Sequence, residues 1–596
     1  MQWTGVLEFV HLFKAFRMAI NPAKIAVALL AVVLVYMSGR VFDFVWGPQV
    51  VSNEIEDYQQ NTPEAYRSMH EAALAARRDN LLETASVLGI NAEDTAYCAD
   101  HPRAAYHKLI ALYEAKFHED VRALANRQPG AFGKTSADFD RESKRLAAAQ
   151  LLRHVEEVRS ASGRGVFEGF QAYEFKQFHA LVDNTLAVIR LVPMPSHDMG
   201  GLSRNAISSG LAARNPDELW QSDTVVGCLA NMTITGPKWL FTTSGPMQWR
   251  PDDAGTWRGW TKMVAFRGLY LVSLIVLLAF WLAIAAFSGS MICRMSALEF
   301  AGIDPPGLAR LSRFATGQFW NFVKAPLMPF VLLLIVALAM AAVGLVGAIP
   351  WIGEVLLGIG MILLLGAGFV VMLLLLGILG GFNLFYPTMA AEGSDSFDAM
   401  SRSFAYVYAR PWRLVFYTVV SLIYGVVTFL FVAFALYLLL AATHMFVGWG
   451  TDLLGWREGA YTGLTKLETM WPTPRMNELA GPVNWWAMSW PEYFGALALH
   501  CWLFLLLSTL VAFVISFYFS THSIIYSLLR RSVDGQSLTD VFQEAPAPEP
   551  SSEPAPVKPA APAATATPAE TTAAPAPAEP APASSPTPAP APETTA

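Results

Sequence analysis

The side chains able to carry out chemistry are scattered along this sequence and do not form a recognisable motif. The polar stretch between residues 48 and 262 holds most of the histidines, but none forms the HxxxH or HExxH spacing that places two zinc ligands on one helical face. They include His101, His107, His118, His154, His179 and His197. We therefore expect no metal site.

Glycine-rich and serine motifs also fall short of known catalytic patterns. Gly163 to Gly169 reads GxGxxxG, not the GxGxxG of a dinucleotide loop, and it follows a predicted helix instead of a strand. The sequence contains no GxxxxGK[ST] and no GxSxG, and Ser244 has no local partner that would activate it. The sequence predicts no catalytic and no cofactor-binding residue.

The four cysteines divide between two settings. Cys293 and Cys501 lie in or beside apolar runs, where a thiol behaves as a small hydrophobe. Cys98 and Cys228 both fall in the polar stretch, and an oxidising compartment would favour a disulfide between them. Two unpaired thiols are the alternative, because sequence does not reveal the distance between them.

Composition indicates a membrane protein. Of 596 residues, 54% are hydrophobic and only 15% are charged, whereas about a quarter of the residues in soluble proteins are charged. The net charge of −7 is modest and spread along the chain, so nucleic acid is not an expected partner.

Six apolar runs are each long enough to cross a bilayer, which takes about 20 helical residues. The predicted transmembrane helices are 25–46, 268–290, 326–349, 355–386, 414–445 and 494–518. The third and fourth form a hairpin with a short turn. Gly377 and Gly381 in the fourth give a GxxxG spacing, which either mediates close helix packing or is ordinary for a membrane helix.

The same device precedes three of these runs: an amphipathic basic helix followed by a proline. The helices are expected within 1–24, 291–325 and 394–410. Apolar residues three or four apart would lie on the membrane surface while cations contact anionic head groups. The candidate lipid contacts are Lys14, Arg17, Arg310, Arg313, Lys324, Arg402, Arg410 and Arg413. The regularity suggests a threefold hairpin repeat, and convergent anchoring is the alternative.

These cations also predict orientation, because basic flanks favour the cytoplasm. With six spans, both termini are cytoplasmic and residues 47–262 form an extracytoplasmic domain. That domain is expected to be mostly helical, including 168–190, with a small β element over about 222–250. The Trp-rich stretch 446–492 reads as an outer loop at the lipid boundary, and 519–544 as a cytoplasmic juxtamembrane segment. The Pro/Ala-rich stretch 545–596 reads as a disordered tail.

Two segments are familiar: SDSFDAMSRSFAYVYARPWRLVFY (Ser394–Tyr417) and IIYSLLRRSVDGQSLTDVF (Ile524–Phe542). They resemble an uncharacterised family of multi-pass membrane proteins of planctomycete-type bacteria. The layout is distantly similar to membrane domains with amphipathic helices before each hairpin, such as the one attached to some glycerophosphodiester phosphodiesterases. The resemblance covers the carboxyl half. It implies residence in the inner membrane and no known activity.

The sequence therefore predicts an all-α polytopic membrane protein with interfacial helices. The favoured function is non-enzymatic, namely envelope organisation or the binding of membrane lipids and of protein partners through the outer domain or the tail. A transporter or pore component is the first alternative, although spans three to five carry no ionisable group near their centres. An enzyme acting on lipid or envelope material is the second.

Overall fold

The computed structural model describes residues 8–46, 164–191, 224–242, 257–453, 464–476, 479–481 and 483–542, with isolated residues between 55 and 153. Within these ranges six helices are long and apolar enough to cross a membrane. They lie in α3 (Pro22–Trp46), α13 (Trp257–Phe300), α16 (Met328–Gly347), α17 (Ile352–Gly381), α20 (Pro411–Leu453) and α22 (Trp490–Asp534). The prediction of an all-helical polytopic protein is confirmed at this level.

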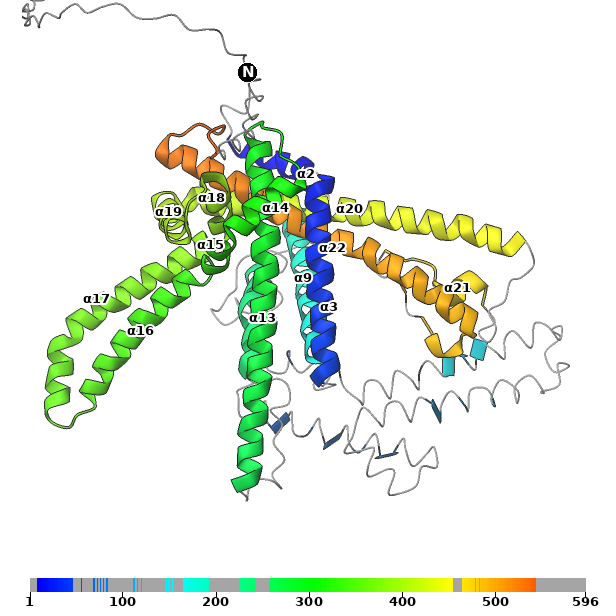
Figure 1. Ribbon diagram of the computed structural model, residues 1–596, viewed down its shortest axis with the longest axis horizontal. Coiled ribbons are helices and arrows are strands. Elements are labelled where there is room, and N and C mark those ends of the chain that lie inside the picture. Colours follow the sequence, from blue (N-terminus) through cyan, green and yellow to red (C-terminus); the bar gives the residue numbers. More distant parts are fainter. Residues whose placement is uncertain are drawn as a thin grey trace, which may run out of the picture. The chain divides into compact units, whose positions relative to one another are not determined.

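The long helices pack as three hairpins: α3 with α13, α16 with α17, and α20 with α22 (Figure 1). The turn between α16 and α17 is tight, and Trp351 in it adopts a φ of 73°. Gly353 follows because a Cβ there would lie 2.5 Å from the Val346 carbonyl oxygen. The α17 helix continues through a 3-10 turn, η6 (Phe382–Leu384), into α18 (Phe385–Glu392).

Short helices precede each hairpin. They are η1 (Glu8–Phe13) and α2 (Lys14–Ala19), α14 (Leu308–Gly317) and α15 (Phe319–Lys324), and α19 (Ser396–Ala409). We call the second helix of each hairpin its return helix: α13, α17 with its continuation α18, and α22. Each set of short helices packs on the return helix of the hairpin before it, α14 on α13 and α19 on α17. The first set packs on the last return helix, with α2 on α22. The arrangement therefore closes on itself in a threefold pattern, as the repeat hypothesis requires.

The ends of the return helices repeat the same local structure. α13, α18 and α22 are each followed by a glycine in the left-handed region, Gly302, Gly393 and Gly535, with φ of 79°, 68° and 70°. An αL residue at this position closes the last turn of a helix, and glycine adopts it without steric strain. An acidic residue lies within three positions before each glycine. Three equivalent ends agree with three copies of one unit.

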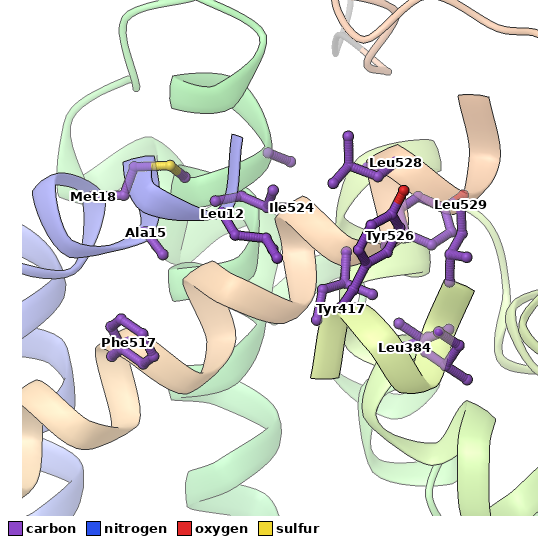
Figure 2. Packing of buried hydrophobic residues seen from close by; sticks show 14 of the residues in the cluster. Leu12, Ala15, Met18, Leu384, Tyr417, Phe517, Ile524, Tyr526, Leu528 and Leu529 are labelled. Carbon is purple, nitrogen blue, oxygen red and sulfur yellow. The ribbon is translucent and has the colours of Figure 1, made fainter. Parts of the chain in front are cut away.

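These ends meet in a region that we call the return-helix junction, made of Ser288–Phe300, Leu384–Glu392 and Ser516–Asp534. Small polar groups are buried there in contact with one another, and the hydroxyls of Ser296 and Ser520 lie 3.0 Å apart. Figure 2 shows the apolar cluster beside them, in which Leu12 of η1 and Met18 of α2 share a core with Ile524 of α22. The junction accounts for the extension of α13 beyond Ser290 and of α22 beyond Tyr518, because polar residues past these points, such as Ser296 and Ser520, are buried against protein.

Parts of the stripes on the second and third sets of short helices are buried against protein. Leu311 and Ala315 of α14, Phe322 of α15 and Met400 of α19 are at most 4% exposed. Other residues of the predicted stripes stay exposed, among them Phe13, Leu308 and Phe397. Contact of the stripes with lipid therefore stays a prediction for these residues. The buried part of each stripe packs in the cores that α13 and α18 help to form, and the cations Arg310 and Arg313 of α14 lie exposed.

The part of the chain between α3 and α13 is helical wherever it forms regular described elements. It contains α9 (Val166–Leu191), α11 (Val225–Ala230), the π-helical turn η4 (Asn231–Thr235) and α12 (Gly236–Thr242). The β element predicted for 222–250 is therefore wrong over Val225–Thr242. Thr224 caps the helix by accepting a hydrogen bond from the Gly227 amide at 2.8 Å, and burial of Cys228 and Trp239 overrides the β propensity of the neighbouring residues.

Two further short helices follow α20: α21 (Lys466–Met470) and the 3-10 turn η7 (Trp485–Ala487). Trp471 is 4% exposed and packs on His444 of α20, so this tryptophan of the predicted outer loop serves a protein core. The predicted disordered tail lies outside the described residues. The interfacial role of the remaining tryptophans stays a prediction.

Candidate functional site

The polar centre of the described structure is Glu392, at the end of α18. Its Oε2 lies 2.6 Å from Arg402 Nη1, and its Oε1 lies 3.2 Å from Arg530 Nε and accepts a hydrogen bond from the Tyr526 hydroxyl. The Glu392 side chain is 9% exposed and that of Arg530 is 12% exposed. One carboxylate therefore joins α18, α19 and α22 in an environment poor in water.

A second carboxylate lies beside the first. Asp534 accepts a hydrogen bond from the hydroxyl of Tyr406, whose ring packs 5.9 Å from that of Tyr526. Burial raises the pKa of the Tyr406 phenol above its ordinary value, so the phenol remains a donor at neutral pH. A hydrogen bond to Asp398 raises the pKa of Arg402. Glu392 and Asp534 are therefore each held by a group that keeps its proton at neutral pH: Glu392 by the Arg402 guanidinium group and Asp534 by the Tyr406 phenol.

Arg294 ties the chain segment after α22 to this junction. It is 5% exposed; its Nη1 donates to the Ala390 carbonyl at 2.8 Å and its Nη2 to the Phe542 carbonyl at 2.6 Å. The Phe542 amide in turn donates to the Ala391 carbonyl at 2.8 Å. We call residues 535–542 the strap, because these bonds hold its end across α13 and α18. Arg530 adds a hydrogen bond to the Asp540 carbonyl.

A separate ion pair lies where the first hairpin begins and ends. Lys24 of α3 is fully buried, and its Nζ lies 2.7 Å from Glu299 Oε2 near the end of α13. Together the two pairings bind each return-helix end to a neighbouring element. The ion pairs of Glu392 and of Lys24 suit a clamp between hairpins. Among the described residues, no three His, Cys, Asp or Glu side chains are grouped so that they could hold a metal ion.

Sequence reasoning missed this network. Arg402 was predicted, but as a lipid contact, while Glu392, Tyr526 and Lys24 carried no recognisable motif. One signal did point to the site: the two segments with a family resemblance contain Arg402 and Tyr406, and Tyr526, Arg530 and Asp534.

The eight predicted lipid contacts fall into two groups. Most lie exposed on the short helices or at their ends, with no ion pair described, namely Arg17, Arg310, Arg313, Lys324 and Arg410. The others meet protein groups: Lys14 lies over the Phe300 ring at 5.6 Å, Arg402 belongs to the network, and Arg413 lies 3.3 Å from Glu8. The structure thus does not gather all eight into one surface.

Arg310 and Arg313 share a shallow hollow of about 390 Å³ at the start of α14. Pro306, Gly307 and Ala309 complete its lining. Both guanidinium groups border a concave space, an arrangement that suits an anionic oxygen-rich group better than isolated surface cations do.

The predicted disulfide is not tested, because Cys98 lies outside the described residues. Cys228 is buried, and its sulfur accepts a hydrogen bond from Asn184 Nδ2 at 3.5 Å. The pairing stays a prediction.

The GxxxG glycines of α17 accommodate α19. A Cβ on Gly377 would lie 2.7 Å from the Tyr408 hydroxyl oxygen and 2.8 Å from the Phe404 ring, and one on Gly381 would lie 3.0 Å from that ring. Of the two hypotheses for this motif, the structure supports close packing, with an aromatic face of α19 as the partner.

Replacing Gly377 by leucine should therefore lower the free energy of unfolding by about 1–3 kcal/mol, the usual cost of overpacking. Gly366→Leu in the same helix is the matched control, since a Cβ there meets nothing within 4 Å. Thermal unfolding of both variants in one detergent, followed by tryptophan fluorescence, measures the difference. Equal midpoints would show that α19 does not press on Gly377.

No family model, curated protein or solved structure matches this chain.

Proposed function

We propose that this chain is a multi-pass protein of the bacterial inner membrane that acts without catalysis, by binding anionic lipid at its cytoplasmic face and by binding protein partners. The observation that carries the proposal is the set of exposed cations on the short helices, Arg310 and Arg313 above all. Anionic head groups attract such cations with about 1 kcal/mol each.

Burial of the apolar stripes sharpens the proposal. Because Leu311 and Ala315 of α14 and Met400 of α19 are buried against protein, these two helices do not depend on lipid for their position, and Arg310 and Arg313 are presented from a fixed protein surface. A fixed surface can select a head group, whereas a helix that merely floats in the interface responds to charge density alone. Envelope organisation is the role that this arrangement fits best.

Orientation and family are proposed on the sequence. Lysines and arginines concentrate before α3, between α13 and α16, and between α17 and α20. Because basic flanks favour the cytoplasm, we propose that these flanks and both termini lie there. Membership of the planctomycete-type membrane family is proposed on Ser394–Tyr417 and Ile524–Phe542. Protein partners would meet the extracytoplasmic segment or the tail.

The test compares anionic and neutral lipid. Purified protein is reconstituted in nanodiscs of phosphatidylcholine with or without 30% phosphatidylglycerol or cardiolipin, and the unfolding midpoint is measured. We expect the anionic lipid to raise the midpoint, and Arg310→Glu together with Arg313→Glu to remove most of that rise, because binding to the native state alone stabilises it.

Arg475→Glu is the matched control, since Arg475 is exposed but lies between α21 and α22, away from the short helices. A lipid-dependent rise that survives in the Arg310/Arg313 double variant, or that is lost equally with Arg475→Glu, would contradict head-group binding at α14.

Transport is the second candidate, and one observation favours it. The polar helix α9 packs against α3 and α20 among the long helices, where a purely structural segment would be expected to be apolar.

A further inference from the structure

Helix α9 begins at the end of α3 that is farthest from the short helices. The carboxylate of Asp43 accepts hydrogen bonds from the backbone amides of Phe167 at 2.7 Å and Glu168 at 2.9 Å, which caps the first turn of α9. Phe167 also lies against Gly39, whose missing side chain makes room for the ring. The start of α9 is thereby fixed beside the last turns of α3.

From this point α9 runs back along the long helices. Eleven residues after Phe167, about 16 Å along the helix, the Phe178 ring packs 5.2 Å from that of Phe429 in α20. Phe429 borders the same core cluster as Phe16 of α2, which contacts Phe431 and Phe513. Because α2 lies at the opposite end of α3 from Asp43, α9 is antiparallel to α3 and extends into the layer that α3 spans (Figure 1).

Helices α11 and α12 return along α9. Cys228 of α11 meets Asn184 near the carboxyl end of α9, whereas Gly236 at the start of α12 faces Glu174 and Phe170 near its amino end. Trp239 of α12 then joins a core with Tyr270 of α13. The segment α11–α12 therefore runs antiparallel to α9, and it passes Glu174 at Gly236, directly after the π-helical turn η4.

One face of α9 is exposed and carries ionisable groups. Lys176, His179 and Asp183 follow one another at intervals of three and four residues, and all three are exposed. The exposed positions of α3 at corresponding levels are apolar, for example Leu30, Leu34 and Met37. Lipid hydrocarbon is a favourable environment for the apolar side chains of α3 and a strongly unfavourable one for the ionisable side chains of α9.

We propose that α9 and α11–α12 form a re-entrant hairpin whose polar face borders a water-filled vestibule, open to the extracytoplasmic side and able to admit small polar solutes. Segments that enter a membrane without crossing it are tolerated where they are covered by protein or face such water. The proposal deepens the transport candidate and rests on the proposed orientation of the chain.

Cysteine accessibility tests the vestibule. Lys176→Cys, His179→Cys and Asp183→Cys are made singly in a background with Cys98→Ser and Cys501→Ser, and intact spheroplasts are treated with a membrane-impermeant methanethiosulfonate. Leu34→Cys, 40% exposed in the native structure, is the matched control on α3. We expect His179→Cys to react at least tenfold faster than Leu34→Cys, since only thiols in water form the reactive thiolate.

Arg153→Cys, at an exposed residue of the outer segment, reports orientation alone. If Arg153→Cys reacts in spheroplasts while His179→Cys reacts no faster than Leu34→Cys, the vestibule is wrong and the orientation stands. If both thiols react only in inverted vesicles, the orientation fails and the extracytoplasmic opening fails with it.

Discussion

Replacing Glu392 by alanine should lower the free energy of unfolding by about 3–5 kcal/mol, because the change removes the buried carboxylate beside the Arg530 guanidinium group and leaves it only the exposed Asp540 at 3.6 Å. Arg530 is only 12% exposed, and the Tyr526 hydroxyl loses its acceptor at the same time. Urea or thermal unfolding of the detergent-solubilised protein, monitored by tryptophan fluorescence, measures the loss.

Asp398→Ala is the matched control for this prediction. Asp398 pairs with the same Arg402, but four residues away on one helix and with both side chains about 40% exposed. An exposed pair of that kind contributes roughly 0.3–0.5 kcal/mol. Equal losses in the two variants would mean that Glu392 is an ordinary surface acid and that no clamp exists.

Replacing Glu299 by glutamine should be nearly as damaging, at about 3–5 kcal/mol, because it leaves Lys24 buried without an opposite charge. Lys24→Met should cost less, since the Glu299 side chain is 25% exposed and water can solvate it. The same unfolding measurement separates the two variants.

A double variant completes the cycle. With Lys24→Met and Glu299→Gln together, no buried charge remains, so stability should return to within about 1–2 kcal/mol of the wild type. If the two losses simply add, the residues do not act as a pair.

The spans could be predicted from sequence because their signal is local. A helix in lipid makes all its backbone hydrogen bonds internally and needs only about 20 apolar residues to cross the membrane. Runs such as 326–349 can therefore be recognised without knowing what they pack against. The short basic helices were also predictable, because the apolar period of Leu308, Leu311 and Ala315 is typical of one helical face.

The features that the sequence does not determine depend on contacts between distant segments. Tertiary packing decides whether Leu311 contacts lipid or α13, and an apolar stripe is favourable in either place. The segment Val225–Thr242 carries β-branched residues, and only its packing on α9 makes it helical. The two buried ion pairs are the hardest to predict from sequence, because Lys24 and Glu299 are 275 residues apart and Glu392 and Arg530 are 138 residues apart. No local pattern can pair such residues.

The contact between the first short helix and the last long one has a consequence for how the protein is made. The Ser516 hydroxyl donates to the Ala19 carbonyl across 497 residues. A ribosome adding 5–20 residues per second needs roughly 25–100 s to synthesise that interval. Throughout this time the amino-terminal helix has emerged without its final partner, so assembly of the ring must wait for nearly complete translation, and the insertion machinery or the lipid surface has to shelter α2 until then.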